Sequence, residues 1–285
     1  MTPSAVLAPL APADVARTVD LALAEDLAGG TDVTTVATVP EDAVCTGDLA
    51  ARRPGVVAGL AFARAVFERL GADVVEHVAD GARVAAGDVL LPVTGPTRGV
   101  LTAERTALNL VGQLSGVATL TAAWVDAVAG TGAVVRDTRK TVPGLRAAQK
   151  YAVRCGGGAN HRMGLADQAL VKDNHIVAAG SVTAALAAVR ALAPDIVCEV
   201  ECDTYEQVVE AVAAGARLVL LDNMDVATMR RCVEVARPAG VRTEASGALS
   251  LGSAREVALT GVDFLAVGAL THSAPVLDIG LDLRP

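Results

Sequence analysis

Residues 196–236 read IVCEVECDTYEQVVEAVAAGARLVLLDNMDVATMRRCVEVA, and their pattern decides the class of the fold. Two short apolar runs, 196–201 and 218–223, have the composition of buried strands. A segment with helical spacing of apolar residues follows each run, at 204–214 and at 225–236. Strands that alternate with helices in this way are typical of a parallel sheet with helical crossovers. The stretch therefore predicts an α/β fold.

The same alternation continues on both sides of this stretch. Four further strand-like runs alternate with three helical segments: strands at 133–138, 168–173, 240–246 and 263–269, and helices at 143–154, 181–193 and 249–258. The chain thus has six candidate strands, whereas a complete barrel of this class has about eight. We therefore predict an irregular, incomplete α/β barrel.

The N-terminal part of the chain follows a different pattern, with short strands and few helices. A helix at 12–28 stops at two glycines. Strand-like runs at 44–51, 55–60, 74–78 and 89–93 and a helix at 61–70 predict a compact α+β unit. One segment, 80–95, is similar to the domains that carry biotin or lipoate. No lysine precedes Lys140 to bear such a group, so we interpret the segment as sheet architecture.

Length and composition limit the classes of protein. The 285 residues suffice for a barrel with a smaller partner domain. The longest run without a charged residue lies between Arg105 and Asp126, and its Asn109, Gln113 and Ser115 make it too polar for a membrane span. It predicts a buried helix. The N-terminus lacks the pattern of a signal peptide, so we expect a cytoplasmic protein that does not bind a membrane.

Cysteine and aromatic content exclude two further classes. The five cysteines are an odd number without CxxC spacing, which argues against a disulfide framework or a structural zinc site. Aromatic residues make up only 2% of the chain. Nucleic-acid binding by stacking on an exposed basic face is therefore not expected.

Residues 137–175 concentrate positive charge, although the formal net charge of the chain is −8. All three lysines of the chain lie in this stretch. Arg139, Lys140 and Lys172 each follow the C-terminal end of a strand-like run, where α/β proteins bind ligands. Arginine and lysine at such positions predict a site for a polyanion.

Three other cations of this stretch receive a different interpretation. Arg146, Lys150 and Arg154 are spaced by four residues, so they share one side of a helix. We interpret them as a solvated helix face.

Carboxylates also follow two strand-like runs, at Glu201 and Asp222. Glu199, Glu201 and Asp203 alternate with apolar residues, so they lie on one face of their strand. A carboxylate that faces a barrel interior needs cations, a metal or hydroxyls around it. We therefore favour a functional role for Glu201. Asp222 or Asn223 also fits the N-cap of the following helix. A capping role and a functional role for Asp222 are compatible.

Two turns of small residues follow the last two strand-like runs. They are Ser246–Ala248 and Val267–Ala269, and each leads toward a helix. Backbone N–H groups in such turns suit a phosphate, and barrel enzymes often bind phosphate after their last two strands.

Motifs along nearly the whole chain give a specific resemblance. The sequence is similar to the quinolinate phosphoribosyltransferase family in the motifs RTALNLVGQLSGVAT (105–119), DTRKTVPGLR (137–146), GGGANHRMGLAD (156–167), LVKDNHI (170–176), EVE (199–201), LLDNM (220–224), EASG (244–247) and VGALTHS (267–273).

The resemblance implies a fold, a reaction and an assembly. It implies an N-terminal α+β sandwich domain, which we place at 1–112, and an irregular α/β barrel, which we place at 113–272. The tail 273–285 is a candidate for packing on the first domain. It also implies transfer of phosphoribosyl from phosphoribosyl pyrophosphate to quinolinate with Mg²⁺, releasing pyrophosphate and CO₂, in a homodimer whose active sites take residues from both subunits.

The resemblance also implies roles for individual residues. Quinolinate carboxylates are expected to meet Arg105 of the neighbouring subunit, Arg139, His161 and Arg162. Thr138 is expected among the substrate-binding residues. Lys140 and Lys172 are expected at the substrate and the donor phosphates. Glu201 and Asp222 are expected to hold the ribose hydroxyls or Mg²⁺, the ion directly, through water or through the donor pyrophosphate. With Lys140 and Lys172 they form the catalytic set.

The glycine turns complete the expected site. The 5′-phosphate is expected to bind the two turns formed by Ser246, Gly247 and Ala248 and by Val267, Gly268 and Ala269. Ala248 departs from the family pattern, which often has Gly or Asn at this position. The substitution leaves backbone donation intact.

Three rival functions stay open on the sequence alone. The first is a Schiff-base aldolase with Lys172 as the amine, which does not explain the surrounding cations. The second is a close relative with another substrate, such as the phosphoribosyltransferase-like proteins of metal-uptake operons. The third is a binding module without catalysis.

Overall fold

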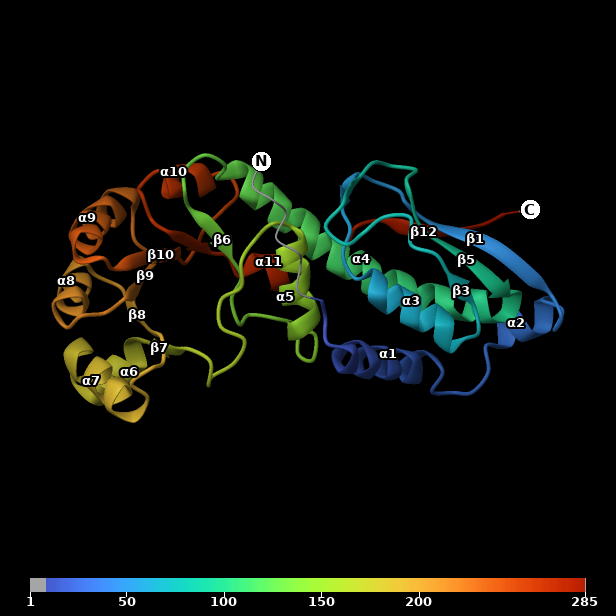
Figure 1. Ribbon diagram of the computed structural model, residues 1–285, viewed down its shortest axis with the longest axis horizontal. Helices are drawn as coiled ribbons and strands as arrows, with labels where there is room; N and C mark the ends of the chain where they lie inside the picture. Colours follow the sequence, from blue (N-terminus) through green and yellow to red (C-terminus); the bar gives the residue numbers. More distant parts are fainter. Residues whose placement is uncertain (1–8, 285) are drawn as a thin grey trace. The chain divides into compact units, whose positions relative to one another are not determined.

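A computed structural model describes residues 9–284 of the chain (Figure 1). The chain forms two compact units: unit 1 is Met1–Ala122, Thr141–Gly157 and Leu270–Pro285, and unit 2 is Ala123–Lys140 and Gly158–Ala269. The units interleave along the chain, whereas the sequence predicts one break after residue 112. The position of that break stays a prediction.

Unit 2 contains a parallel sheet of six strands in the order β6-β11-β10-β9-β8-β7. The strands are β6 (Val134–Arg136), β7 (Ala169–Val171), β8 (Cys198–Cys202), β9 (Leu218–Asp222), β10 (Arg242–Ser246) and β11 (Phe264–Ala266). Within residues 9–284, β6 and β7 are the edge strands and do not pair with each other. The predicted incomplete α/β barrel with an N-terminal α+β domain is confirmed.

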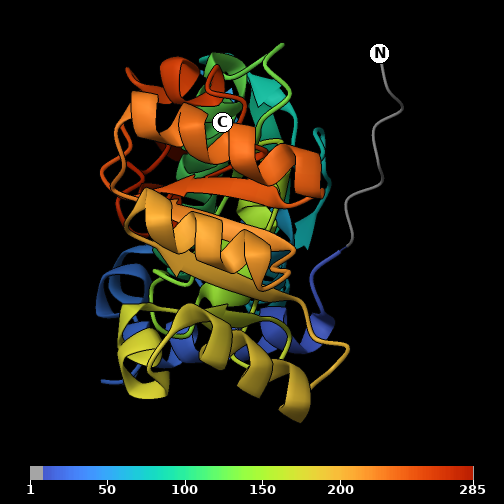
Figure 2. The same ribbon diagram turned by 90° about the vertical axis from the view of Figure 1, so that its left-hand side faces the viewer.

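Helices cover the outer face of this sheet. They are α6 (Asp173–Ala179), α7 (Val182–Leu192), α8 (Tyr205–Ala213), α9 (Val226–Ala236) and α10 (Ala254–Ala258), with η1 (Arg237–Ala239) after α9. Figure 2 shows α7, α8 and α9 side by side. The continuous burial of Leu218 to Leu221 is typical of a parallel strand with both faces covered.

Three details differ from the predicted elements of unit 2. Helix α6 was not predicted; it begins directly after β7 and ends at Gly180, whose φ of 93° suits glycine. Helix α10 is shorter than the predicted 249–258. The N-cap of α9 is Asp225, whose carboxylate accepts the Thr228 N–H at 2.7 Å. The capping role considered for Asp222 and Asn223 is therefore wrong.

Unit 1 is built on an antiparallel sheet with the order β12-β1-β5-β3. Strands β2 and β4 form a separate two-stranded antiparallel sheet. The strands are β1 (Val44–Ala51), β2 (Gly55–Val56), β3 (Asp73–Val74), β4 (Arg83–Val84), β5 (Val89–Pro96) and β12 (Ile279–Arg284). The C-terminal tail thus joins the N-terminal sheet. Arg52 strengthens this joint with two bonds of 2.7 Å to Asp282.

The helices of unit 1 are α1 (Pro12–Asp26), α2 (Val33–Thr38), α3 (Leu60–Arg69), most of α4 (Thr97–Ala127) and α5 (Arg146–Cys155). The predicted strand 55–60 stops early because Gly59 takes a φ of 93° and Leu60 begins α3. The short helix α11 (Ala269–His272) links the last strand of unit 2 to the tail.

Helix α4 contains the long run without charges. The helix is long and apolar enough to cross a membrane, but 61% of its apolar 18-residue stretch is buried inside the protein. Its polar residues explain this placement. Ser115 Oγ accepts the Ala58 N–H at 3.0 Å, and Thr119 Oγ1 accepts the Val56 N–H at 2.9 Å. The hydroxyls therefore pair backbone groups that are buried against the helix.

Helix α5 corrects one prediction. Lys150 was interpreted as part of a solvated face with Arg146 and Arg154, but its side chain is completely buried. Its neighbours Gln149 and Tyr151 are also buried, so α5 is enclosed on several sides rather than exposed on one.

Glycine at position 116 of α4 allows close packing within unit 1. A Cβ atom there would lie 2.0 Å from the Pro275 carbonyl oxygen. Alanine in a helix interior normally stabilises by about 1 kcal/mol relative to glycine. Because backbone must move here, we expect Gly116→Ala to lower the free energy of unfolding by about 2 kcal/mol, measured by denaturant titration.

The matched control is Gly29→Ala, since a Cβ at Gly29 would have no atom within 4 Å. It should change the free energy of unfolding by less than about 0.5 kcal/mol. Equal stability of both variants would contradict the packing argument.

Candidate active site

A cavity of about 340 Å³ lies at the C-terminal ends of the strands of unit 2. Lys140, Lys172, Glu201 and Asp222, which come from four different segments, all line it. The complete lining is Thr138, Arg139, Lys140, His161, Arg162, Leu170, Lys172, Glu201, Leu220, Asp222, Glu244, Ser246 and Ala266. The parallel strands bring these residues together because their carboxyl ends meet at one edge.

Six predicted site residues do not line this cavity. Gly247 and Ala248 directly follow Ser246, and Val267, Gly268 and Ala269 directly follow Ala266, so they lie at its margin. Arg105 is an exposed residue of α4 in unit 1.

A larger cavity of about 500 Å³ lies in unit 1, among α1, α4 and residues 143–145. Its lining contains one cation, Arg17, and two acids, Glu25 and Asp26. That composition does not suit an anionic substrate, so size alone does not identify the site.

The cations of the unit 2 cavity are only partly compensated. Lys172 Nζ lies 2.5 Å from Glu201 Oε2, and the Lys172 side chain remains 44% exposed. Burial, followed by the charge of Arg139, lowers the pKa of Arg162. The Nε atom of Arg139 is buried without a hydrogen-bond partner among the described residues. Two nearby guanidinium groups with an unused donor favour binding of an anion.

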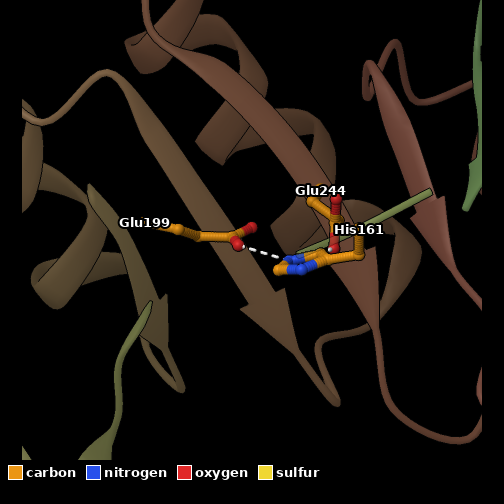
Figure 3. A group of neighbouring side chains, drawn as sticks. All are labelled: His161, Glu199 and Glu244. Carbon is orange, nitrogen blue, oxygen red and sulfur yellow. Dashed lines mark hydrogen bonds and ion pairs between the residues drawn. The ribbon is translucent and has the colours of Figure 1, made fainter. Parts of the chain in front are cut away.

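Two carboxylates and a histidine form a buried cluster beside the cavity (Figure 3). His161 Nε2 lies 2.6 Å from Glu199 Oε2 and 3.6 Å from Glu244 Oε1. Glu244 also accepts a 2.6 Å bond from Arg136, and Glu199 accepts one of 3.1 Å from Gln168. The cluster therefore ties β6, β8 and β10 to the segment that carries His161.

Burial governs the protonation of this cluster. It raises the pKa of Glu199 to about 7, with the charge of Arg136 acting in the opposite direction. Burial, and next the charge of Glu199, raises the pKa of Glu244 to about 7. One guanidinium cannot balance two buried carboxylates, so the cluster tends to retain a proton near neutral pH.

The His161 ring is engaged on both nitrogens. Nδ1 accepts the Arg162 backbone N–H at 2.7 Å, so Nε2 carries the hydrogen and donates to Glu199. The expected contact of His161 with a substrate carboxylate stays a prediction. The ring lines the cavity, but these bonds fix the backbone of Arg162 against Glu199.

The same cluster could in principle hold a metal, since its ligand atoms lie within 4.8 Å of one another. The guanidinium of Arg136 already pairs with Glu244, so a divalent cation at this cluster would be repelled by the positive charge of Arg136. The oxygen donors of Glu201 and Asp222 fit Mg²⁺ better, because they are carboxylates at the solvent-accessible cavity.

Two backbone donors expected to meet a phosphate have acceptors in the protein. The Ala248 N–H donates to Asn223 Oδ1 at 3.2 Å, and the Val267 N–H donates to the Arg136 carbonyl at 2.9 Å. The expectation that these two N–H groups are available is corrected.

Glu199 and Glu244 were not predicted as members of this buried cluster, of which Glu244 and His161 line the cavity. Glu199 carried a signal, since it alternates with Glu201 on one strand face. Glu244 carried one too, because it is a carboxylate within the strand-like run 240–246. Arg136 carried a similar signal, since it interrupts the apolar run at 133–138, whereas Gln168 carried none.

Comparison with known proteins agrees with this geometry. The family models of the quinolinate phosphoribosyl transferase N-terminal and C-terminal domains match residues 32–115 and 117–282. A nicotinate-nucleotide pyrophosphorylase [carboxylating] of Mycobacterium leprae is 56% identical over 280 residues, covering 95% of this chain and 98% of the relative.

More distant relatives agree over similar lengths. A chloroplastic nicotinate-nucleotide pyrophosphorylase [carboxylating] of Arabidopsis thaliana is 39% identical, covering 95% of this chain and 83% of the relative. The structure of the nicotinate-nucleotide pyrophosphorylase from Francisella tularensis superposes with a TM-score of 0.93 at 38% identity, covering 97% of this chain and 98% of that one. The chain therefore belongs to the quinolinate phosphoribosyltransferase family.

Proposed function

We infer that this chain transfers phosphoribosyl from 5-phosphoribosyl 1-pyrophosphate to quinolinate and decarboxylates the product. The products are nicotinate mononucleotide, pyrophosphate and CO₂, as a step of NAD biosynthesis. The observation that carries this inference is the convergence of Lys140, Lys172, Glu201 and Asp222 on one cavity. Family membership supports the same reaction.

The cations account for binding of the pyridine substrate. Quinolinate carries two adjacent carboxylates, and Arg139 and Arg162 present planar guanidinium groups that bind carboxylates in pairs. Leu170 and Leu220 add an apolar surface on which the ring can lie. The ring nitrogen would then face the open part of the cavity, where the donor binds.

The remaining groups account for binding of the donor. Lys140 and Lys172 would contact its phosphates, and the turns that begin at Ser246 and Val267 would hold the 5′-phosphate. Glu201 and Asp222 would hold Mg²⁺, directly, through water or through the donor pyrophosphate, and the bound ion would offset the charge of the leaving group. The two carboxylates would also balance positive charge that develops on the ribose.

Decarboxylation needs no nucleophile from the chain. After the ring nitrogen attacks the ribose carbon and pyrophosphate leaves, the ring is cationic. The neighbouring carbon–carbon bond then breaks, CO₂ departs, and the electron pair remains on the ring carbon beside the cationic nitrogen. That carbon takes a proton. The protein contributes position and electrostatics.

We further propose a cytoplasmic homodimer that binds neither nucleic acid nor membrane. Arg105 would complete the quinolinate site of the neighbouring subunit, which suits its exposed position on α4. A second function, an aldolase with Lys172 as the amine, is less well supported because the Lys172 ammonium is paired with Glu201.

We expect Arg139→Ala and Lys172→Ala each to lower kcat/KM by at least about 100-fold, because each removes a fixed charge from an anionic site. The measurement is release of pyrophosphate and CO₂ with quinolinate, compared with nicotinate as an alternative substrate. Arg230→Ala, which removes an exposed arginine of α9, is the control and should be active. Turnover of nicotinate but not quinolinate would overturn the assigned substrate.

We expect mixed Arg105→Ala and Lys172→Ala subunits to regain activity. In a hybrid dimer one site would keep Lys172 of one subunit and Arg105 of the other, so random exchange should restore about a quarter of wild-type activity. The measurement is turnover after mixing, with subunit exchange shown by mass labels. No recovery despite exchange would contradict the shared site.

A further inference from the structure

Asn223 has an unusual backbone between two parts of the cavity wall. It follows β9 directly after Asp222, and its φ is +51°, the only positive value for a non-glycine among residues 9–284. Asparagine tolerates this left-handed conformation better than most residues, but the conformation still needs support. A residue in this conformation persists only where the surrounding structure supports it.

Three hydrogen bonds hold Asn223 in place. Its backbone N–H donates to the Ser246 carbonyl at 3.1 Å. Its side-chain Nδ2 donates to Asp222 Oδ2 at 2.7 Å, and its Oδ1 accepts the Ala248 N–H at 3.2 Å. The residue therefore links the end of β9 to the turn after β10, whose strands pair Asp222 with Ser246.

The two side-chain bonds require an amide. One partner is a carboxylate, which only accepts, and the other is a backbone N–H, which only donates. Aspartate at position 223 would place an oxygen against the Asp222 carboxylate. Alanine would lose both bonds, and it fits the left-handed backbone poorly.

The turn is packed directly on this amide. Gly247 has a φ of +107°, and a Cβ there would lie 2.3 Å from Asn223 Oδ1 and 2.7 Å from Asn223 Cγ. Glycine at 247 thus allows the turn to pack closely against the Asn223 side chain, and that side chain fixes the position of the turn.

We propose that Asn223 is a positioning residue whose amide couples the Asp222 carboxylate to the Ser246–Ala248 turn. The inference rests on the proposed function, in which these groups bind opposite ends of the ribose 5-phosphate unit of the donor. Asn223 acts through its two neighbours, and the geometry requires no contact of its own with substrate. The coupling sets the distance between the group that meets the ribose or metal and the group that meets the 5′-phosphate.

Asn223→Gly tests the side-chain amide alone. Glycine adopts a φ of +51° without strain, so the variant keeps the backbone conformation and loses only the amide. We expect this variant to fold as the wild type and to bind phosphoribosyl pyrophosphate with MgCl₂ about tenfold more weakly by calorimetry. The KM for quinolinate should change less than about twofold, because the amide does not contact Arg139 or Arg162. Asn223→Asp should show the same pattern.

A measurement that does not depend on enzyme activity tests whether Asn223 positions the Ser246–Ala248 turn. In ligand-free protein, hydrogen exchange at the Ala248 amide should be faster in Asn223→Gly than in the wild type. Asn174→Asp makes the same chemical change at an exposed asparagine of α6 and should leave exchange and donor affinity unchanged.

Wild-type donor affinity in Asn223→Gly would overturn the proposal and show that only the backbone conformation matters. Unchanged exchange at Ala248 would overturn it too. If the wild type binds the donor but does not turn over quinolinate, the proposed function fails and the affinity comparison still decides the role of Asn223. If the wild type does not bind the donor, both inferences fail.

Discussion

Carboxylates that point into a parallel sheet are the constraint on which the rest of this structure depends. Glu199 and Glu244 are completely buried, and an isolated buried charge is too costly to persist. Arg136 on β6 and His161 hydrogen-bond to these carboxylates, and the strand order that places β11 between β6 and β10 brings Arg136 within reach of Glu244. His161 and Glu244 of this network also line the cavity.

Much of the fold was predictable because each unit carries a local signal. The βα alternation of unit 2 predicted the six strands, since parallel strands buried on both faces read as apolar runs. Helix α6 was missed because its seven residues follow β7 without a break. The burial of Lys150 was missed because regular spacing of cations resembles an exposed face, and only tertiary packing distinguishes the two.

The site was predictable to the extent that strand ends converge. Glu201 and Asp222 lie at the C-terminal ends of β8 and β9, so topology alone brings them to one cavity. Hydrogen-bond partners were not predictable, because they depend on side-chain orientation. His161 illustrates this: its place in a cationic motif suggested a substrate contact, whereas both ring nitrogens are used within the protein. Ala248 and Val267 illustrate the same limit for backbone donors.

The cations of the cavity outnumber its accessible acids. Arg139, Lys140, Arg162 and Lys172 face Glu201 and Asp222, and the cluster of Glu199 and Glu244 is largely offset by Arg136 and a retained proton. Burial, and next the charge of Arg139, lowers the pKa of Arg162, and an anion that binds between the two guanidinium groups reduces their mutual repulsion. The folded protein therefore holds positive charge in the cavity that anionic substrates can neutralise. The fixed positions of the cationic side chains then determine which anions bind.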